Sequence, residues 1–340
     1  MSALSEATND SAPALTAATD ASDDAGNDSS DDALLEMLGL PSLAISTTTT
    51  PPPLPPQLSD LDALPTEQFQ SLRESYNSTG LARLSTPALT PFLPTHASLL
   101  KITSEIIYSP LPTILRTHET TTTKVLTRLE NFVTVHPTWT SICGSKGTLS
   151  TLLGRLFNTA PWPLYKEKLN LKPPGGKGFA PHLDHPSLAV TGLASSFVTV
   201  MLAIDAMTEL NGCLEVTTGP WTAANAVTCE QPAGDNPDGD GRRGAIPPEV
   251  AKELEWTKIA ADGAAVYIFS GHIPHKSNYN VSLLPRRAVF LTYNHPDEGD
   301  QRENYYESML ATRDGFKDKL KKVREEAARV EDDWLASVPK

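Results

Sequence analysis

The residue types at positions 182 to 184 can bind a metal ion. His182 and Asp184 are two positions apart, so on an extended strand their side chains leave the same face. One imidazole and one carboxylate on one face supply two ligands of the two-histidine, one-carboxylate set that is typical of non-haem Fe(II). The sequence therefore predicts a third ligand, a further histidine brought in from a distant strand.

The segment Ser270–Ser277 offers two histidines for this position, and His275 is preferred to His272. Eleven residues after His275 comes Arg286, at the start of an apolar segment. A guanidinium group there can form a paired, charge-assisted contact with the distal carboxylate of 2-oxoglutarate. Ser277 can add a hydroxyl to the same carboxylate. This pattern predicts an iron site with an anchored cosubstrate.

Each of these residues also has a simpler explanation. His182 can make a hydrogen bond within a loop, Asp184 can end a turn before Pro186, and His275 can be an ordinary surface imidazole. A lone His-x-Asp pair occurs in many unrelated chains. The combination of the pair, the later histidine and Arg286, each at a predicted strand end, favours the metal site.

The surrounding pattern predicts helices first and strands later. Residues 59–160 are expected to be mainly helical and residues 161–296 to form a β-barrel, with a charged helix over 304–330. The expected helices are Glu67–Tyr76, Thr95–Ile107, His118–Val135 and Leu149–Leu156; the expected strands are Tyr165–Leu171, Phe197–Ile204, Cys213–Thr217, Trp256–Ala260, Ala264–Phe269 and Ala288–Tyr293.

Helices followed by about eight short strands are typical of an α+β domain built on a closed or double-sheet barrel. The mouth of such a barrel has room for a metal and one small ligand. The Gly-, Pro- and Asp-rich stretch Glu230–Pro248 is expected to be an exposed, mobile loop. Arg242 and Arg243 in it are either a solvated pair or a contact for an anionic substrate.

Charge separates the N-terminal segment from the rest. The first 72 residues contain no Lys or Arg and twelve acidic groups, so the remainder sums to −13 + 12 = −1. Residues 1–58, rich in Ser, Thr, Pro and Asp, are expected to be a disordered tail, and residues 59–340 the catalytic domain. The near-neutral domain has no basic stripe for phosphates, so no nucleic-acid partner is expected.

Other signals favour a cytoplasmic protein that acts on a small molecule. The N-terminus has neither a secretory nor a mitochondrial signal pattern. No apolar stretch approaches the ~20 residues that cross a bilayer, so no membrane partner is expected. Cys143, Cys213 and Cys229 are scattered, which favours reduced thiols over a disulfide or zinc site. The sequence does not indicate an oligomeric state.

Several segments resemble the phytanoyl-CoA dioxygenase superfamily of Fe(II)/2-oxoglutarate oxygenases. The similarity covers roughly residues 150–312. The segments that carry it are Leu164–Gly176, the His-x-Asp segment, Asn211–Val216 and Pro274–Ser277 through Arg286-Arg287. Within the superfamily the chain is most similar in motif to the 2-aminoethylphosphonate dioxygenases, through Gly178–Asp184, Leu291–Asn294 and Glu298–Asp300 with Tyr305-Tyr306.

The resemblance implies a double-stranded β-helix, also called a jelly-roll or cupin-like barrel, with the N-terminal helices packed outside. It implies catalysis by an Fe(II) ion, with 2-oxoglutarate and O2 as cosubstrates, and hydroxylation of a C–H bond with release of succinate and CO2. The implied iron ligands are His182, Asp184 and His275, and the implied 2-oxoglutarate contacts are Arg286, Ser277 and Asn170. For Asn170 a hydrogen bond inside the barrel is an equal alternative.

Two questions stay open at this point. The substrate is either an organophosphonate or similar small polar amine, which needs charged pocket walls, or a lipid or secondary metabolite, which needs an apolar tunnel. The chain is either an oxygenase or a catalytically silent barrel that acts as a small-molecule binding module. A metal-dependent hydrolase with the same ligands is a more remote alternative.

Overall fold

The structure is a computed structural model, and it describes residues 66–84, 92–120, 124–222, 224 and 243–312. The expected tail, most of the expected loop with Arg242 and Cys229, and the part of the C-terminal helix beyond Thr312 lie outside these residues.

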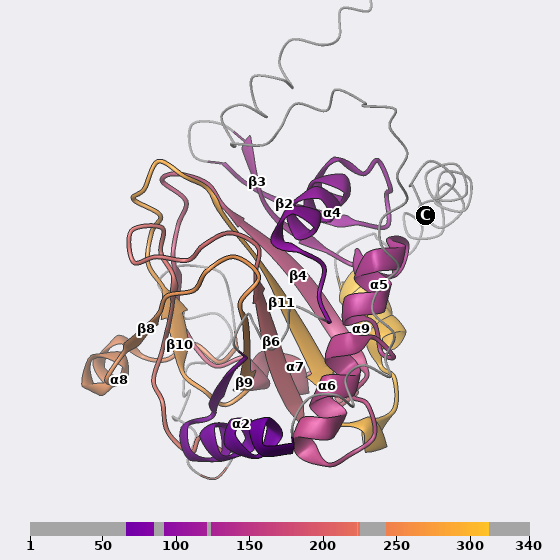
Figure 1. The fold of residues 1–340 in the computed structure, drawn as a ribbon. Helices are drawn as coiled ribbons and strands as arrows, with labels where there is room; N and C mark the ends of the chain where they lie inside the picture. The colour runs from indigo at the N-terminus through magenta and orange to yellow at the C-terminus, as the bar shows by residue number, and fades with distance from the viewer. Residues whose placement is uncertain (1–65, 85–91, 121–123, 223, 225–242, 313–340) are drawn as a thin grey trace, which may run out of the picture. The chain divides into compact units, whose positions relative to one another are not determined.

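Two antiparallel sheets form the centre of the fold (Figure 1). The large sheet has seven strands in the order β1-β9-β6-β11-β4-β3-β2, and the small sheet has four in the order β5-β10-β7-β8. In the large sheet the strands are β1 (Leu81–Leu84), β9 (Val266–Ser270), β6 (Phe197–Ala203), β11 (Arg286–Asn294), β4 (Leu164–Lys172), β3 (Lys124–Glu130) and β2 (Leu115–Thr120). In the small sheet they are β5 (Phe179–His182), β10 (His275–Ser277), β7 (Leu214–Val216) and β8 (Thr257–Ile259).

The central strands of the large sheet are covered on both faces. All seven residues of β6 are buried, which explains its continuous apolar run. On β11, Val289, Leu291 and Tyr293 pack into the core shared with the helices, whereas Ala288 and Phe290 belong to a second core shared with the small sheet. Strand alternation therefore gives the large sheet one face for helices and one for the functional pocket.

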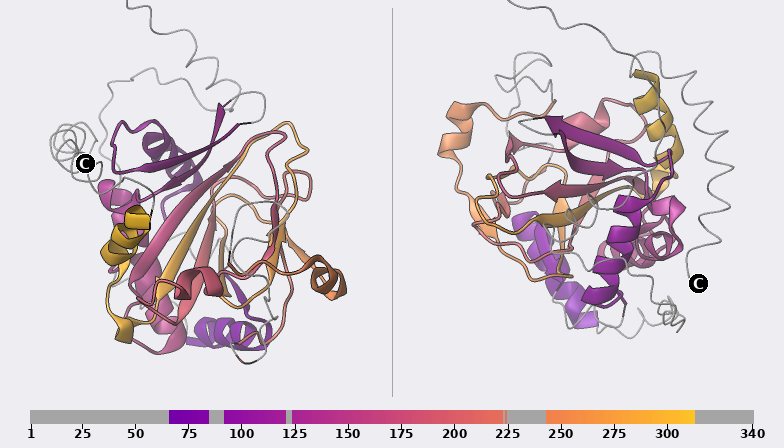
Figure 2. Two further views of the ribbon diagram at one scale, coloured as in Figure 1. Left: turned by 180° about the vertical axis from the view of Figure 1, so that it is seen from behind. Right: turned by 90° about the horizontal axis from the view of Figure 1, so that it is seen from above.

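Helices cover the first of these faces. Leu99, Ile102 and Ile106 of α4 share one core with Trp139 of α5 and Leu153 of α6. Figures 1 and 2 show these helices together on the side of the large sheet away from the small sheet. The helices are α2 (Thr66–Thr79), α4 (His96–Tyr108), α5 (Pro137–Cys143), α6 (Thr148–Phe157), α7 (His185–Ala189), α8 (Pro248–Glu253) and α9 (Arg302–Thr312), with 3-10 turns η2 (Val133–Val135) and η3 (Pro296–Glu298).

The expected helix over His118–Val135 is wrong, because this segment forms the β2–β3 hairpin and the turn η2. Its apolar residues fit helical spacing, but β3 pairs with β4 and places Leu129 opposite Leu169. The segment is also rich in threonine, a β-branched residue that favours strands. With β1, the part expected to be mainly helical thus contributes three strands to the large sheet.

Among the helices that the structure describes, none combines the length and apolar character needed to cross a membrane.

Candidate metal centre

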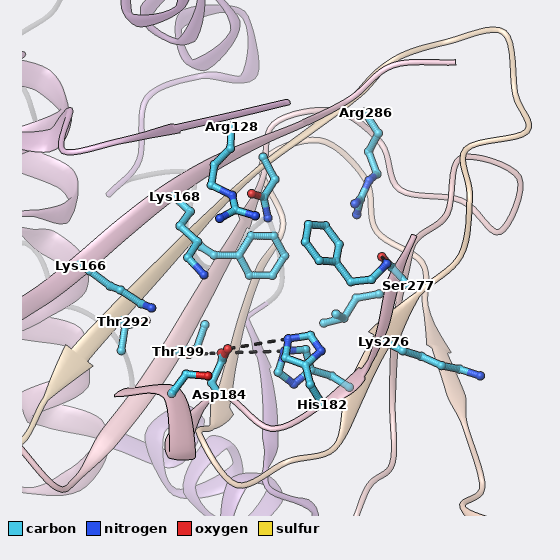
Figure 3. A pocket seen from close by; sticks show the side chains of 16 residues that line it. Arg128, Lys166, Lys168, His182, Asp184, Thr199, Lys276, Ser277, Arg286 and Thr292 are labelled. Carbon is cyan, nitrogen blue, oxygen red and sulfur yellow. Dashed lines mark hydrogen bonds and ion pairs between the residues drawn. The ribbon is translucent and has the colours of Figure 1, made fainter. Parts of the chain in front are cut away.

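A cavity of about 210 Å³ lies between the two sheets. Its walls come from β3, β4, β6 and β11 on one side and from β5, β7 and β10 on the other (Figure 3). The lining residues are Arg128, Lys166, Lys168, Asn170, Phe179, His182, Asp184, Ser187, Thr199, Leu214, His275, Lys276, Ser277, Arg286, Phe290 and Thr292. All six residues singled out in the sequence as metal or cosubstrate contacts are among them.

Strand pairing brings the two distant histidines together. His182 is the last residue of β5 and His275 the first of β10, and these two residues are direct partners in the antiparallel ladder. Asp184 follows two residues after His182 and caps α7. The His182 and His275 rings lie with their centroids 4.1 Å apart. The structure therefore places the three predicted ligands at one point, although 93 positions separate His182 from His275.

The three side chains converge without bonding to one another directly. The distance from His182 Nε2 to Asp184 Oδ1 is 4.0 Å, and that from His275 Nε2 to Asp184 Oδ2 is 3.9 Å. Both are longer than a hydrogen bond. One ligand atom from each residue lies within 4.8 Å of the others, an arrangement that can hold a metal ion.

Backbone carbonyls select the nitrogen that each ring presents. His182 Nδ1 lies 2.7 Å from the carbonyl oxygen of Ala180, and His275 Nδ1 lies 3.0 Å from that of Ile273. A carbonyl only accepts, so Nδ1 carries the proton in both rings and Nε2 keeps its lone pair. This is the usual arrangement of a metal-binding histidine.

Asp184 is held in its ionised form. Burial alone would raise the pKa of this carboxyl, but His275, His182, Lys168 and Lys166 outweigh burial and hold the pKa well below its usual range. Thr199 Oγ1 donates to Asp184 Oδ2 at 3.3 Å. An ionised, oriented carboxylate is the form that binds a cation.

Arg286 is a buried cation without an acidic partner among the described residues. Its side chain is 2% exposed, Nη1 contacts Met207 Sδ at 3.4 Å, and Nε has no hydrogen-bond partner. Burial lowers its pKa to about 10, so the guanidinium stays charged at neutral pH. An unpaired buried charge is costly, and a carboxylate bound in the pocket would remove that cost. The residues therefore fit 2-oxoglutarate.

Ser277 is oriented as a donor toward the pocket. Its Oγ accepts from Lys172 Nζ at 2.9 Å and from the Phe179 backbone N–H at 3.3 Å. Because both partners donate, the Ser277 hydroxyl proton is free for a third group. Burial, followed by the charge of Arg286, lowers the pKa of Lys172 to about 7. Lys172 was not singled out in the sequence as a site residue.

Asn170 faces the cavity from β4, opposite Ala288 of β11 and Arg128 of β3. Its Oδ1 is buried and has no hydrogen-bond partner in the described part of the chain. The alternative of a hydrogen bond inside the barrel is therefore not seen for this oxygen, and the atom is available to a ligand.

The neighbouring histidines are placed apart from the three converging ligands. His272 stacks on His185 with ring centroids 4.1 Å apart, and burial followed by the charge of His185 lowers the pKa of His272 to about 4. Arg287 points away from the cavity, as expected from alternation, and pairs with Asp205 at 2.6 Å.

Four cations that line the cavity were missed in the sequence: Arg128, Lys276 and, on β4, the two lysines Lys166 and Lys168. A signal for the two lysines exists, because polar residues occupy every second position of β4 between apolar ones such as Leu169. That alternation marks one polar face of a strand, but the sequence does not show that this face turns inward.

Comparisons with known proteins agree with this geometry. Residues 115–288, slightly more than half of the chain, match the phytanoyl-CoA dioxygenase (PhyH) family. A 2-aminoethylphosphonate dioxygenase from an uncultured bacterium is 35% identical over 211 residues, which cover 61% of this chain and 70% of that protein. A methylphosphonate hydroxylase from Gimesia maris is 34% identical over 185 residues, which cover 53% of this chain and 65% of that protein.

Solved structures show the same fold. EctD from S. alaskensis in its apoform matches with a TM-score of 0.52 at 18% identity, over 66% of this chain and 76% of that chain. The same protein with 2-oxoglutarate and 5-hydroxyectoine matches with a TM-score of 0.51 at 17% identity, over the same shares.

The family match spans the residues that hold the converging ligands. The expected enzyme class, an Fe(II)/2-oxoglutarate-dependent dioxygenase, and the expected cofactors are confirmed at the level of the family. The chain belongs to the phytanoyl-CoA dioxygenase family.

Proposed function

We propose that this protein hydroxylates a C–H bond of a small, anionic molecule of the organophosphonate type. His182, Asp184 and His275 would hold Fe(II), and Arg286 with Ser277 would hold the distal carboxylate of 2-oxoglutarate. The observation that carries this proposal is the buried, unpaired guanidinium of Arg286 in the same cavity as the three converging ligands.

When bound, iron and 2-oxoglutarate supply, together with O2, the oxidising power for hydroxylation, with succinate and CO2 as by-products. The chain supplies position and charge. The carbonyls of Ala180 and Ile273 accept from Nδ1 and so leave the lone pair of each ring on Nε2, and Thr199 orients Asp184. Asn170 would line the same cavity from β4, where its amide nitrogen is the group that can donate to the cosubstrate.

For the fold we propose a closed double-stranded β-helix over residues 161–296, within a catalytic domain of residues 59–340. Three observations support it: all strand pairs are antiparallel, the site lies between a large and a small sheet, and EctD shares the fold at a TM-score of 0.52.

The cavity walls favour a small polar substrate over a lipid. Arg128, Lys166 and Lys168 line the cavity beside the converging ligands, and the volume is about 210 Å³. An acyl chain would need an apolar tunnel, since burying it against unpaired cations gains little. The names of the two relatives, both of which are phosphonate enzymes, point to the same class.

The alternative is a binding module without turnover. A barrel that had lost catalysis would not need to retain three converging ligands and an unpaired arginine in one cavity. Succinate release distinguishes the two functions directly.

The test measures succinate from Fe(II), 2-oxoglutarate and O2 with 2-aminoethylphosphonate, methylphosphonate, an acyl-CoA and a simple amine as candidate substrates. We expect turnover with a phosphonate, and none in Asp184→Ala or His275→Ala, because each variant lacks an iron ligand. His272→Ala is the matched control and should retain turnover. Succinate release by Asp184→Ala at the normal rate would contradict the metal site; absence of succinate from the unmodified protein would favour the binding module.

A further inference from the structure

Two lysines of β4 lie at positions that are rarely occupied by lysine in the central strands of a sheet. Lys166 is buried and Lys168 half-buried, and both lie on the strand face that lines the cavity. Lysine is almost never buried unless it is paired, because moving a charge out of water is costly. Two such residues on one strand face require either an internal partner or a bound ligand.

Among the described residues, neither lysine has a carboxylate within ion-pair distance, and the Tyr305 ring centroid lies 5.4 Å from Lys166 Nζ. Burial would lower the pKa of Lys166, but Tyr305, Asp184 and Glu130 outweigh burial and raise it, so Lys166 stays charged in the cavity. Arg128 contacts Glu130 at 3.4 Å through Nη1, but its buried Nε has no partner. These three cations form what we call the β4 cationic cluster.

Other lysines of the region show what a satisfied lysine looks like here. Lys276 lies 3.6 Å from Glu215 and over the Trp256 ring, and it points away from the site in Figure 3. Lys172 donates to the Gly212 and Asn278 carbonyls and to Ser277. Lys166 and Lys168 of the β4 cationic cluster have no such ion pair among the described residues.

The members of the cluster repel one another. The charge of Lys166, then burial, then Arg128 lower the pKa of Lys168 to about 7, against the opposing influence of Glu130 and Asp184. In the proposed function the charge of Asp184 is taken up by the metal. The cavity therefore has an excess of positive charge that a bound anion would neutralise.

The two lysines of the cluster lie apart from the 2-oxoglutarate anchor, and Arg128 borders both regions. In Figure 3, Lys166 and Lys168 lie on the Asp184 side of the site, whereas Arg286 lies on the other side, above the histidines. The hydroxyls of Thr199 and Thr292 line the cavity between the lysines and Asp184. A cosubstrate anchored at Arg286 thus leaves the cluster free for a second molecule.

We propose that Lys166, Lys168 and Arg128 form an oxyanion subsite that binds the tetrahedral acidic group of the substrate beside the metal centre. This rests on the proposed function and adds the residues that select the substrate. Three donors from two adjacent strands surround a tetrahedral dianion better than a planar carboxylate, and they hold the carbon next to the acidic group near Asp184.

The experiment measures binding of methylphosphonate by calorimetry without O2, to protein loaded with Mn(II) and 2-oxoglutarate and to metal-free protein. Lys166→Met and Lys168→Met each remove the ammonium group and keep an unbranched side chain that is one atom shorter. We expect each to weaken methylphosphonate binding about tenfold or more while the 2-oxoglutarate Kd changes less than about threefold. Lys101→Met, at an exposed site on α4, is the control and should change neither.

Thermal unfolding separates a lost contact from a lost fold. Lys168→Met removes a charge that its neighbours repel and should leave the ligand-free melting temperature equal or higher, whereas loss of a lysine with a structural role would lower it. Lys168→Gln serves as a second variant should Lys168→Met not fold. Normal methylphosphonate binding in folded Lys166→Met and Lys168→Met would overturn the subsite.

Two further ligands test the chemistry. Dimethyl methylphosphonate has no charge and should not bind, and acetate should bind more weakly than methylphosphonate; acetate binding as tightly would overturn the tetrahedral oxyanion. The metal-free arm separates this inference from the proposed function. If 2-oxoglutarate fails to bind but methylphosphonate still needs both lysines, the subsite stands and the oxygenase proposal fails.

Discussion

At the scale of single residues, the site is defined by which atoms lack a partner. Nε2 of His182 and of His275 faces Asp184 with its lone pair, because a backbone carbonyl occupies Nδ1 in each ring. The Nε atom of Arg286 and Oδ1 of Asn170 are buried and unpaired. Buried polar atoms are nearly always hydrogen-bonded, so the unpaired atoms in this cavity indicate that ligands complete the site.

Arg286→Ala should raise the KM for 2-oxoglutarate by much more than about tenfold, because a buried charge pair loses one partner. Arg286→Lys keeps the charge but loses the planar fork, so its KM should lie between those of the unmodified protein and the alanine variant. Steady-state succinate release at varied 2-oxoglutarate gives the values.

The control for this prediction is the next residue. Arg287→Ala breaks the pair with Asp205 outside the cavity, so it should lower the melting temperature and leave this KM within about twofold. An unchanged KM in Arg286→Ala would assign the anchor to another residue.

Lys168 predicts how stability depends on pH. Its pKa is about 7 in the folded protein and 10.5 as the ordinary value, so between these pH values the unfolded chain binds more protons. The destabilisation by protonated Lys168 is complete below pH 7 and disappears as the pH rises toward 10.5.

Metal-free Lys168→Met should therefore melt higher than the unmodified protein at pH 6.5, by roughly 2–4 °C for each ~1 kcal/mol of relieved repulsion. The difference should be much smaller at pH 9.5. Melting curves at both pH values give the comparison, and a difference that does not change with pH would show that Lys168 is not electrostatically strained.

At the scale of elements, α9 fixes β4 from the face opposite the cavity. Glu167 is fully buried and accepts from Arg302 Nε at 3.0 Å and Nη2 at 2.5 Å, from Tyr306 at 3.1 Å and from the Val133 N–H at 2.9 Å. Since neighbours on a strand point to opposite faces, this network also sets where Lys166 and Lys168 stand.

Glu167→Gln should lower the free energy of unfolding by roughly 3–5 kcal/mol, because Arg302 remains as a buried, unpaired charge. The double variant Glu167→Gln/Arg302→Met should lose less than the sum of the single variants. Denaturant unfolding measures both. The control Lys101→Met breaks an exposed pair with Glu105 and should lower the free energy of unfolding by less than ~1 kcal/mol. An equally small decrease in Glu167→Gln would show that the Glu167 network does not hold α9 to β4.

The sequence predicted best those helices and strands whose spacing of apolar residues fits only one type of secondary structure. β6 is a continuous run of buried apolar residues, and α6 has a strong helical periodicity closed by Asn158 in the left-handed region. The β2–β3 hairpin was mistaken for a helix because the spacing of its apolar residues suits both structures. β5 and β10 are three or four residues long, so pairing with neighbours defines them more than local preference does.

The candidate site divides in the same way. The pair His182–Asp184 was accessible because a two-residue spacing has a fixed meaning on a strand. Lys166 and Lys168 were not, because the direction of the polar face of β4 depends on its register with β3 and β11, which only the assembled sheet shows.

At the scale of the whole molecule, the two sheets bring residues from distant sequence segments together around one cavity. Pairing of β5 with β10 joins His182 to His275, and β11 brings Arg286 to the opposite wall. The net charge of −13 conceals this, because almost all of the net negative charge lies before Arg73, whereas five cations line the cavity. The positive charge of the cavity, rather than the negative net charge of the chain, determines that the site favours an anionic ligand.

The most direct test of the account is an anaerobic titration of the protein with Fe(II) and then 2-oxoglutarate, followed by visible absorption. Three converging ligands with an arginine behind them predict a weak visible absorption band that saturates at one iron and one 2-oxoglutarate per chain. The band should be absent in Asp184→Ala. In Arg286→Ala it should appear only at a much higher 2-oxoglutarate concentration. Failure of the folded, unmodified protein to develop the band with both components in excess would contradict the account.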